Sequence, residues 1–175
     1  MSLVPAFEIS VWNTWILAIV YLLFVYIPIF VLKDYSKKMG QGENYGKIEK
    51  FMEVLFYILL LGSVFLPLKL RTAWFYTGLV IYLLGFIITV ITIINVASVP
   101  LGKPFTKGMY RYSRNPGYLG QMLVFVGIGL ASASWIYLLL SVVLIVLTVL
   151  LIGIEERVTL DKFGEAYQAY MNRTP

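Results

Sequence analysis

The fold is decided by one long apolar stretch, Tyr118–Ile154, which reads YLGQMLVFVGIGLASASWIYLLLSVVLIVLTVLLIGI and carries no charged residue. A single helix over this stretch would be about 55 Å long at roughly 1.5 Å per residue, whereas the hydrocarbon core of a bilayer is roughly 30 Å thick. The stretch must therefore break, and the small polar run Ser132-Ala-Ser134 before Trp135 marks the expected position. We predict a helical hairpin with arms at 118–131 and 135–154.

The rest of the chain has the same apolar character. Hydrophobic residues make up 60% of it, charged residues only 13%, and the mean hydropathy is +0.85, values typical of a protein whose solvent is lipid. Three further apolar runs, at 11–32, 51–68 and 72–99, are each about long enough to cross a bilayer. The predicted fold class is all-α: a polytopic membrane protein of about five transmembrane helices, forming one domain over residues 1–175.

The basic residues predict how these helices are oriented. Of the 14 Lys and Arg residues, five lie at 33–50, four at 103–114 and three after Glu156, while Lys69 and Arg71 stand alone between the second and third runs. Cytoplasmic loops carry an excess of Lys and Arg. We therefore expect the N-terminus outside, and the C-terminus, a solvated loop at 33–50 with Gly40, Gly42 and Gly46, and a loop at 100–117 in the cytoplasm.

The residue inventory excludes several kinds of chemistry. The chain has no Cys and no His. A thiolate nucleophile, an imidazole base, a disulfide and an ordinary zinc or haem site are therefore excluded, and no metal site is predicted. Catalysis must use carboxylates, Arg, Lys, Tyr, Asn, Gln or Ser. Membrane lipids are the expected partners, and no nucleic acid is expected.

Two polar groups interrupt the apolar pattern. The first is the cationic loop Gly108–Gly120, GMYRYSRNPGYLG, in which Asn115-Pro116 predicts a turn. The second is the pair Glu155-Glu156 at the end of the hairpin. The loop is compatible with an ordinary cytoplasmic connection, and the pair with a charged helix end next to Arg157. A carboxylate pair at the lipid rim also suits an ammonium, a sulfonium or a ribose diol, and both readings can hold.

The tail after Glu155 is predicted to form an amphipathic helix over 155–171, lying on the membrane surface. Its larger side chains recur at helical spacing on one face, expected to turn toward the cationic loop. This face consists of Glu156, Leu160, Phe163, Tyr167 and Tyr170. Within the hairpin, Gly120, Gly127 and Gly129 are assigned to close helix packing, because no strand precedes them as in a phosphate-binding loop.

Together these motifs resemble a known family. Their order along the chain is similar to the C-terminal signature of the isoprenylcysteine carboxyl methyltransferase and phospholipid methyltransferase superfamily. The segments that carry the likeness are Gly108–Tyr110, Ser113–Gly120, Glu155-Glu156, and Phe163-Gly164 with Tyr167 and Tyr170. The likeness covers about residues 100–172. Asn115 stands where the isoprenylcysteine branch usually has His, which argues against a prenyl-cysteine substrate, and Thr159 replaces an expected leucine.

The resemblance implies a function and a site. In that superfamily the loop and the carboxylate pair bind S-adenosylmethionine at the cytoplasmic rim, and the substrate enters from the bilayer. By position, the cofactor would be lined by Gly108, Met109, Tyr110, Asn115 and Tyr118, with Glu155 and Glu156 on its polar groups. Arg114 would order the loop, and Arg114, Tyr118 and Glu156 are the expected catalytic residues.

The predicted function is therefore an integral membrane methyltransferase that acts on a lipophilic or lipid acceptor. The acceptor group could be a carboxylate, which needs no base, or an amine or thiol, whose proton Tyr118 or a glutamate would take. Two alternatives stay open. The first is a sterol-reductase-like oxidoreductase, which has a similar arrangement of helices, although this chain has few basic residues that could bind the phosphates of a dinucleotide. The second is a non-enzymatic scaffold or transporter subunit, which would leave the cationic loop and the glutamate pair unexplained.

Overall fold

The computed structural model describes residues 10–39 and 46–175; residues 1–9 and 40–45, including Gly40 and Gly42 of the predicted loop, lie outside the described part. The described chain contains helices and no strand, apart from an isolated bridge between Asn13 and Pro67. The helices are α1 (Trp15–Val31), α2 (Tyr35–Lys38), α3 (Lys47–Ser63), α4 (Ala73–Ser98), the 3-10 helix η1 (Gly108–Arg111), α5 (Pro116–Ala131), α6 (Trp135–Phe163) and α7 (Glu165–Met171). The all-α fold class is confirmed.

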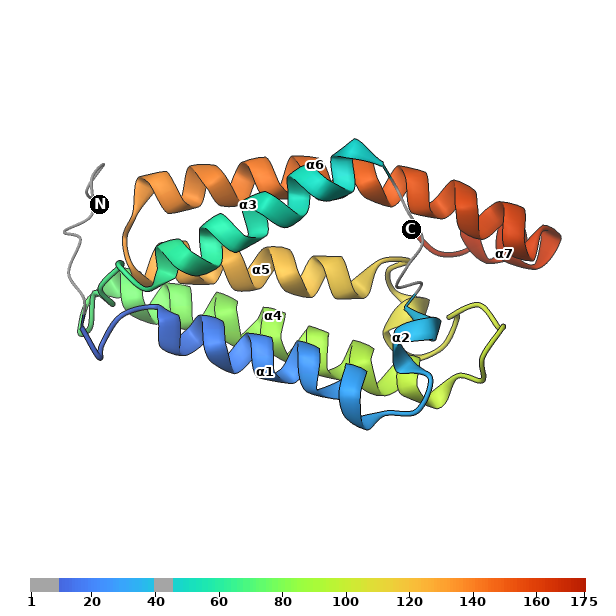
Figure 1. The fold of residues 1–175 in the computed structure, drawn as a ribbon, viewed down its shortest axis with the longest axis horizontal. Coiled ribbons are helices and arrows are strands. Elements are labelled where there is room, and N and C mark those ends of the chain that lie inside the picture. Colours follow the sequence, from blue (N-terminus) through green and yellow to red (C-terminus); the bar gives the residue numbers. More distant parts are fainter. Residues whose placement is uncertain (1–9, 40–45) are drawn as a thin grey trace.

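The arrangement of the long helices is a bundle with α5 at its centre. Helix α4 lies along one side of α5 with α1 beside it, and α6 lies along the other side with α3 beside it (Figure 1). By length and apolar composition, α4 and α6 could each cross a membrane, and α1 and α5 are shorter apolar helices. The core between them is apolar and aromatic, and it includes Leu59, Tyr82, Phe125, Ile128 and Leu144.

The predicted hairpin break is present. Helix α5 ends at Ala131 and α6 begins at Trp135, so the chain turns over the predicted residues Ser132–Ser134. The Ser134 side chain accepts a hydrogen bond from the backbone N–H of Tyr137, the usual role of a serine at a helix start. The antiparallel hairpin places the beginning of α5 beside the distal part of α6.

Glycines bring α4 and α5 into backbone contact. A Cβ on Gly85 of α4 would lie 2.6 Å from the carbonyl oxygen of Gly120, and a Cβ on Gly127 would lie 2.5 Å from the backbone nitrogen of Tyr82. Neither helix can carry a side chain at these contacts without moving apart. Gly129 packs against α6, where a Cβ would lie 2.7 Å from a methyl carbon of the Leu138 side chain. The assignment of Gly120, Gly127 and Gly129 to helix packing is confirmed.

Helix α3 differs from the predicted second span at both ends. It begins at Lys47, inside the predicted solvated loop, because Lys and Glu favour helix where no packing opposes them. It ends at Ser63 instead of residue 68. There Thr14 Oγ1 donates to the carbonyl oxygen of Ser63 at 2.9 Å, and Asn13 Nδ2 donates to that of Val64 at 2.8 Å. These side chains bind carbonyls that a helix leaves without internal partners at its C-terminus.

The tail also differs from its predicted boundaries. Helix α6 continues through Glu155 and Glu156 to Phe163, so the predicted separate helix over 155–171 is wrong. No Gly or Pro interrupts residues 154–163, whereas Gly164 takes a φ of 54°, a conformation that favours glycine and ends the helix. The short helix α7 then folds back beside the end of α6 (Figure 1). The two glutamates are therefore held on a rigid helix.

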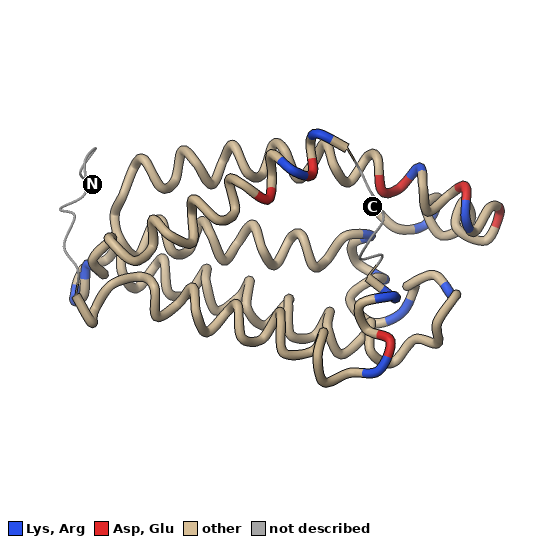
Figure 2. The backbone as a smooth tube through the Cα atoms, viewed as in Figure 1, with Lys and Arg blue, Asp and Glu red and all other residues tan. Residues whose placement is uncertain are grey.

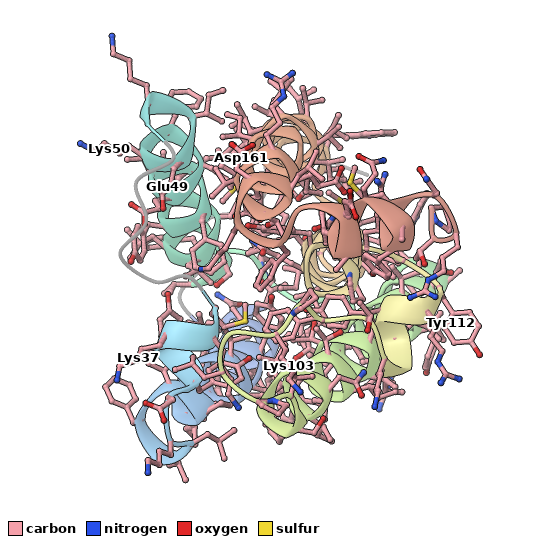
Figure 3. All side chains as sticks on the ribbon, turned by 90° about the vertical axis from the view of Figure 1, so that its right-hand side faces the viewer. Lys37, Glu49, Lys50, Lys103, Tyr112 and Asp161 are labelled. Carbon is pink, nitrogen blue, oxygen red and sulfur yellow. The ribbon has the colours of Figure 1, made fainter. Side chains whose placement is uncertain are left out.

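Charged residues gather at one end of the bundle. Figure 2 shows Lys, Arg, Asp and Glu around α2, α7, the start of α3 and the end of α6, while the α3–α4 connection at the opposite end carries Lys69 and Arg71. Figure 3 views the charged end: Lys37 of α2 and Lys103 of the α4–α5 connection lie on one side, and Asp161 of α6 lies on the other. The predicted charge asymmetry thus corresponds to two physical ends.

Candidate active site

The charged end contains a cavity of about 530 Å³. This volume lies in the range of small-molecule sites, roughly 300–1,000 Å³. Its walls come from α1, α2, α4, the α4–α5 connection, α5, α6 and α7. Of the predicted site residues, the cavity is lined by Tyr110, Arg114, Asn115, Tyr118, Glu155 and Glu156.

Glu156 is bound to the loop residues that precede α5. Asn115 Nδ2 donates a hydrogen bond to Glu156 Oε1 at 3.0 Å, and Arg114 Nε lies 3.3 Å from the same oxygen. The two side chains of the ion pair are 25% and 15% exposed, so the charges attract each other with limited screening by water. This contact fixes the turn before Pro116 against α6.

Glu155 has a different partner. The hydroxyl of Tyr118, in the first turn of α5, donates to Glu155 Oε1 at 2.6 Å. This is the length expected when a hydroxyl donates to a carboxylate. The hairpin explains why the residues meet, because the start of α5 lies beside this part of α6. Two adjacent carboxylates therefore contact different groups, a guanidinium and an amide at Glu156 and a phenol at Glu155.

Aromatic side chains form another part of the cavity wall. The Tyr170 hydroxyl donates to the carbonyl oxygen of Tyr110 at 2.7 Å, which joins α7 to η1. The rings of Tyr167 and Tyr170 lie 5.6 Å apart, and those of Phe105 and Tyr110 lie 5.4 Å apart. All four residues line the cavity. Three of them belong to segments that the sequence analysis placed beside the glutamates; Phe105 was not singled out.

These phenols stay protonated near neutral pH. Burial raises the pKa of Tyr170 to about 12, with Tyr167 adding to the shift. Burial also raises the pKa of Tyr110, and the pKa of Tyr167 is raised by burial and by the neighbouring charge of Glu156. The aromatic wall therefore offers neutral rings and hydrogen-bond donors, but no base, at pH 7.

Two of the predicted cofactor-binding residues do not line the cavity. Gly108 and Met109 are absent from the cavity lining. Gly108 has a φ of 63° and packs so closely on the side chain of Asn95 that a Cβ would overlap it. Met109 accepts backbone hydrogen bonds from Tyr112 and Ser113. Both residues shape the η1 turn that presents Tyr110.

The part of the cavity wall formed by α2 was not predicted from the sequence. Residues 33–50 were expected to be a solvated loop, but α2 folds against the end of α4, where Lys38 Nζ donates to the carbonyl oxygen of Ala97 at 2.9 Å. Tyr35 and Met39 line the cavity beside Lys38. A four-residue helix leaves no periodic signal in a sequence, so only its buried Tyr35 distinguished it from loop.

The deep end of the cavity was also not predicted. There α1 contributes Tyr21 and Val25, and α4 contributes Thr89, Thr92 and Ile93. Gln121 of α5 completes this part. Within the spans these residues resemble ordinary core positions, and only the packing of α1 on α4 shows that they face a common space.

The profile of the phospholipid methyltransferase family matches residues 73–166, more than half of the chain. The chain belongs to this family. The match begins at α4 and ends in α7, so it contains the loop, the hairpin and both glutamates. Neither the curated proteins nor the solved structures include a significant match to the chain. As a member of the phospholipid methyltransferase family the chain is assigned to membrane methyltransferases, which bears out the resemblance seen in its sequence.

Proposed function

We propose that the chain is an integral membrane enzyme that transfers a methyl group from S-adenosylmethionine to a lipophilic or lipid acceptor at the cytoplasmic rim. The observation that carries the proposal is the cavity at the charged end, which gathers Asn115, Tyr118, Glu155 and Glu156 from two helices. Family membership favours methyl transfer over the oxidoreductase and the scaffold.

The residues of the cavity suit S-adenosylmethionine. That molecule carries a sulfonium, an ammonium and a ribose diol, and carboxylates bind all of these groups. Glu155 and Glu156 supply two carboxylates, while Tyr167 and Tyr170 offer aromatic faces that attract cations. When bound there, S-adenosylmethionine supplies an electrophilic methyl group.

Arg114 and Asn115 act as positioning residues in this proposal. Both contact Glu156, so they hold the loop and keep this carboxylate in one orientation. Methyl transfer from a sulfonium is a single in-line displacement, which depends on alignment and exclusion of water more than on acid–base groups. A site without His or Cys is therefore sufficient.

Tyr118 and Glu155 would handle a proton when the acceptor is an amine or a thiol. The short hydrogen bond between them lets Tyr118 accept a proton as it passes its own to the carboxylate. A carboxylate acceptor needs no such step.

We further propose that five helices cross the membrane. Helices α1 and α3 have 17 residues each and α5 has 16, which gives about 24–26 Å of helix, slightly short of a roughly 30 Å hydrocarbon core. Residues that flank these helices complete the crossing. The charged end then lies at the cytoplasmic rim, in agreement with the distribution of Lys and Arg.

Binding of radiolabelled S-adenosylmethionine to the purified protein tests the proposal. Changing Glu155 and Glu156 together to Gln should weaken binding at least tenfold, about 1.4 kcal/mol. Glu165→Gln is the matched control, because Glu165 of α7 is exposed and absent from the cavity lining. If the wild type fails to bind S-adenosylmethionine but binds a nicotinamide dinucleotide, the oxidoreductase takes its place.

A further inference from the structure

The cavity changes in polarity along its depth. Its charged residues come from α2, the α4–α5 connection, Arg114 and the last turns of α6, all at the rim. The described residues that line the deep end are uncharged: Tyr21, Val25, Thr89, Thr92, Ile93 and Gln121. An acceptor that reaches this depth therefore places a neutral part of its structure there.

Gln121 is accessible from the rim. It lies one turn after Gly117 on the same face of α5, and Gly117 has no side chain to cover it. A Cβ on Gly117 would have only the Thr92 methyl group nearby, at 3.6 Å. Gln121 also follows Tyr118 by three residues, which places it about 4.5 Å deeper along the helix axis.

The other polar groups of the deep end have protein partners. Thr89 Oγ1 donates to the carbonyl oxygen of Gly85 at 3.0 Å, and Thr92 Oγ1 donates to that of Ile88 at 2.8 Å. The Tyr21 side chain lies close to Thr89 and interacts with it. The Gln121 side chain makes no hydrogen bond within the described chain. An amide in low-dielectric surroundings is costly unless something pairs with it.

We propose that Gln121 determines specificity by binding a carbonyl of the acceptor, in the linkage that joins its head group to its hydrocarbon tail. The inference rests on the proposed function and adds a requirement to it. The acceptor carries an ester or amide linkage about one helical turn deeper than the group that receives the methyl.

The chemistry of the position favours a carbonyl. The Gln121 amide has two N–H donors, and a carbonyl oxygen is the neutral acceptor that pairs with them without bringing a charge into the membrane. Val25 and Ile93 lie in the same part of the cavity and offer apolar contacts to the chain beyond the linkage. A head group at Tyr118, a carbonyl at Gln121 and an apolar tail thus follow one another down the cavity.

The test compares two lipids that differ only in this linkage. Dihexanoyl phosphatidylethanolamine and its dihexyl ether counterpart are titrated separately into the purified protein in detergent, without S-adenosylmethionine. We expect the wild type to bind the ester about fivefold more tightly, the discrimination that one neutral hydrogen bond can supply. In Gln121→Met, which keeps the side-chain length, the difference should fall below twofold.

Gln168→Met serves as the matched control, because Gln168 of α7 is exposed, pairs with Asn172 and does not line the cavity. It should keep the wild-type preference. Gln121→Asn keeps an amide and should keep part of the preference, so it replaces Gln121→Met if that variant does not fold. Equal binding of the two lipids by the wild type, or binding of neither, would overturn the inference. Failure of the proposed function would instead appear as a lack of S-adenosylmethionine binding, measured separately.

Discussion

The Tyr118 hydroxyl donates a 2.6 Å hydrogen bond to Oε1 of Glu155, and this contact joins the first turn of α5 to α6. The neighbouring carboxylate, Glu156, contacts Arg114 and Asn115 instead. Adjacent glutamates on one helix are thereby differentiated. The charge of Glu156 is partly neutralised by the Arg114 guanidinium, and this contact holds the loop in place. Glu155 is instead hydrogen-bonded to the Tyr118 phenol, a group that can exchange a proton.

Tyr118→Phe should slow methyl transfer to an amine or thiol acceptor by about a hundredfold, at the lower end of what acid–base groups contribute. It should also change the pH dependence of kcat, because the phenol that receives the proton is lost. Tyr112→Phe is the control: Tyr112 is 76% exposed and does not line the cavity. An unaltered rate and pH profile in Tyr118→Phe would show that the pair has no part in proton transfer.

Asn115→Ala should raise the KM for S-adenosylmethionine about tenfold and lower kcat, with little change in the pH profile. Its amide orients Glu156 through the 3.0 Å hydrogen bond but cannot act as a base near neutral pH. Asn172→Ala, a change of the same kind at an asparagine outside the cavity lining, should leave the KM unchanged. A displaced pH optimum in Asn115→Ala would instead indicate a role in proton transfer.

The α4–α5 interface should not tolerate even small side chains. Gly127→Ala should destabilise the protein by about 3 kcal/mol, because its Cβ would lie 2.5 Å from the backbone nitrogen of Tyr82 and the helices would have to separate. Gly153→Ala is the matched control, since no atom lies within 4 Å of a Cβ there. Thermal unfolding in detergent should show a large drop for the first variant and none for the second.

Alkaline unfolding should report the burial of Tyr170. Its pKa is raised to about 12 in the folded protein, against about 10 in an unfolded chain. The unfolded state therefore loses this proton first. The contribution of Tyr170 to stability should be complete below pH 10 and be lost as the pH rises toward 12.

Tyr170→Phe separates this effect from the loss of the hydrogen bond to Tyr110. Below pH 10, where Tyr170 is protonated in both states, the missing bond should lower stability by about 1 kcal/mol. The decline between pH 10 and 12 should be shallower than in the wild type. Parallel curves for the two proteins would contradict the burial argument.

The hairpin could be predicted from the sequence because it follows from length alone: residues 118–154 exceed the thickness of a bilayer. The nearness of Asn115 to Glu156 followed in turn, since an antiparallel hairpin returns to its starting end. The glycine packing was equally accessible, because glycine in an apolar helix has few other uses. Periodicity, length and residue type are properties that a sequence displays directly.

Other features depend on contacts that a sequence does not display. The continuation of α6 past Glu155 is an exception: the sequence does show that no helix-breaking residue comes before Gly164, but the charge of the glutamates was interpreted as a helix end. The end of α3 depends on Thr14, about fifty residues away along the chain. Gln121 stands out only because its neighbours have hydrogen-bond partners and its own side chain has none among residues 10–39 and 46–175, a distinction that requires coordinates.

The orientation of the bundle is the prediction on which the proposed pocket depends most. Reporters fused after residue 42 and at the C-terminus should both be cytoplasmic, and one inserted at Ser132–Ser134 should be external. The structure adds a physical link to this expectation, because the backbone N–H of Lys69 donates to the carbonyl oxygen of Ala131 at 2.9 Å, so the α3–α4 connection and the hairpin turn share one end of the bundle. A reporter next to Lys69 should therefore agree with the one at Ser132–Ser134. If the C-terminal reporter were external instead, Glu155 and Glu156 would face away from the cytoplasmic pool of S-adenosylmethionine, and the proposed pocket could not be supplied.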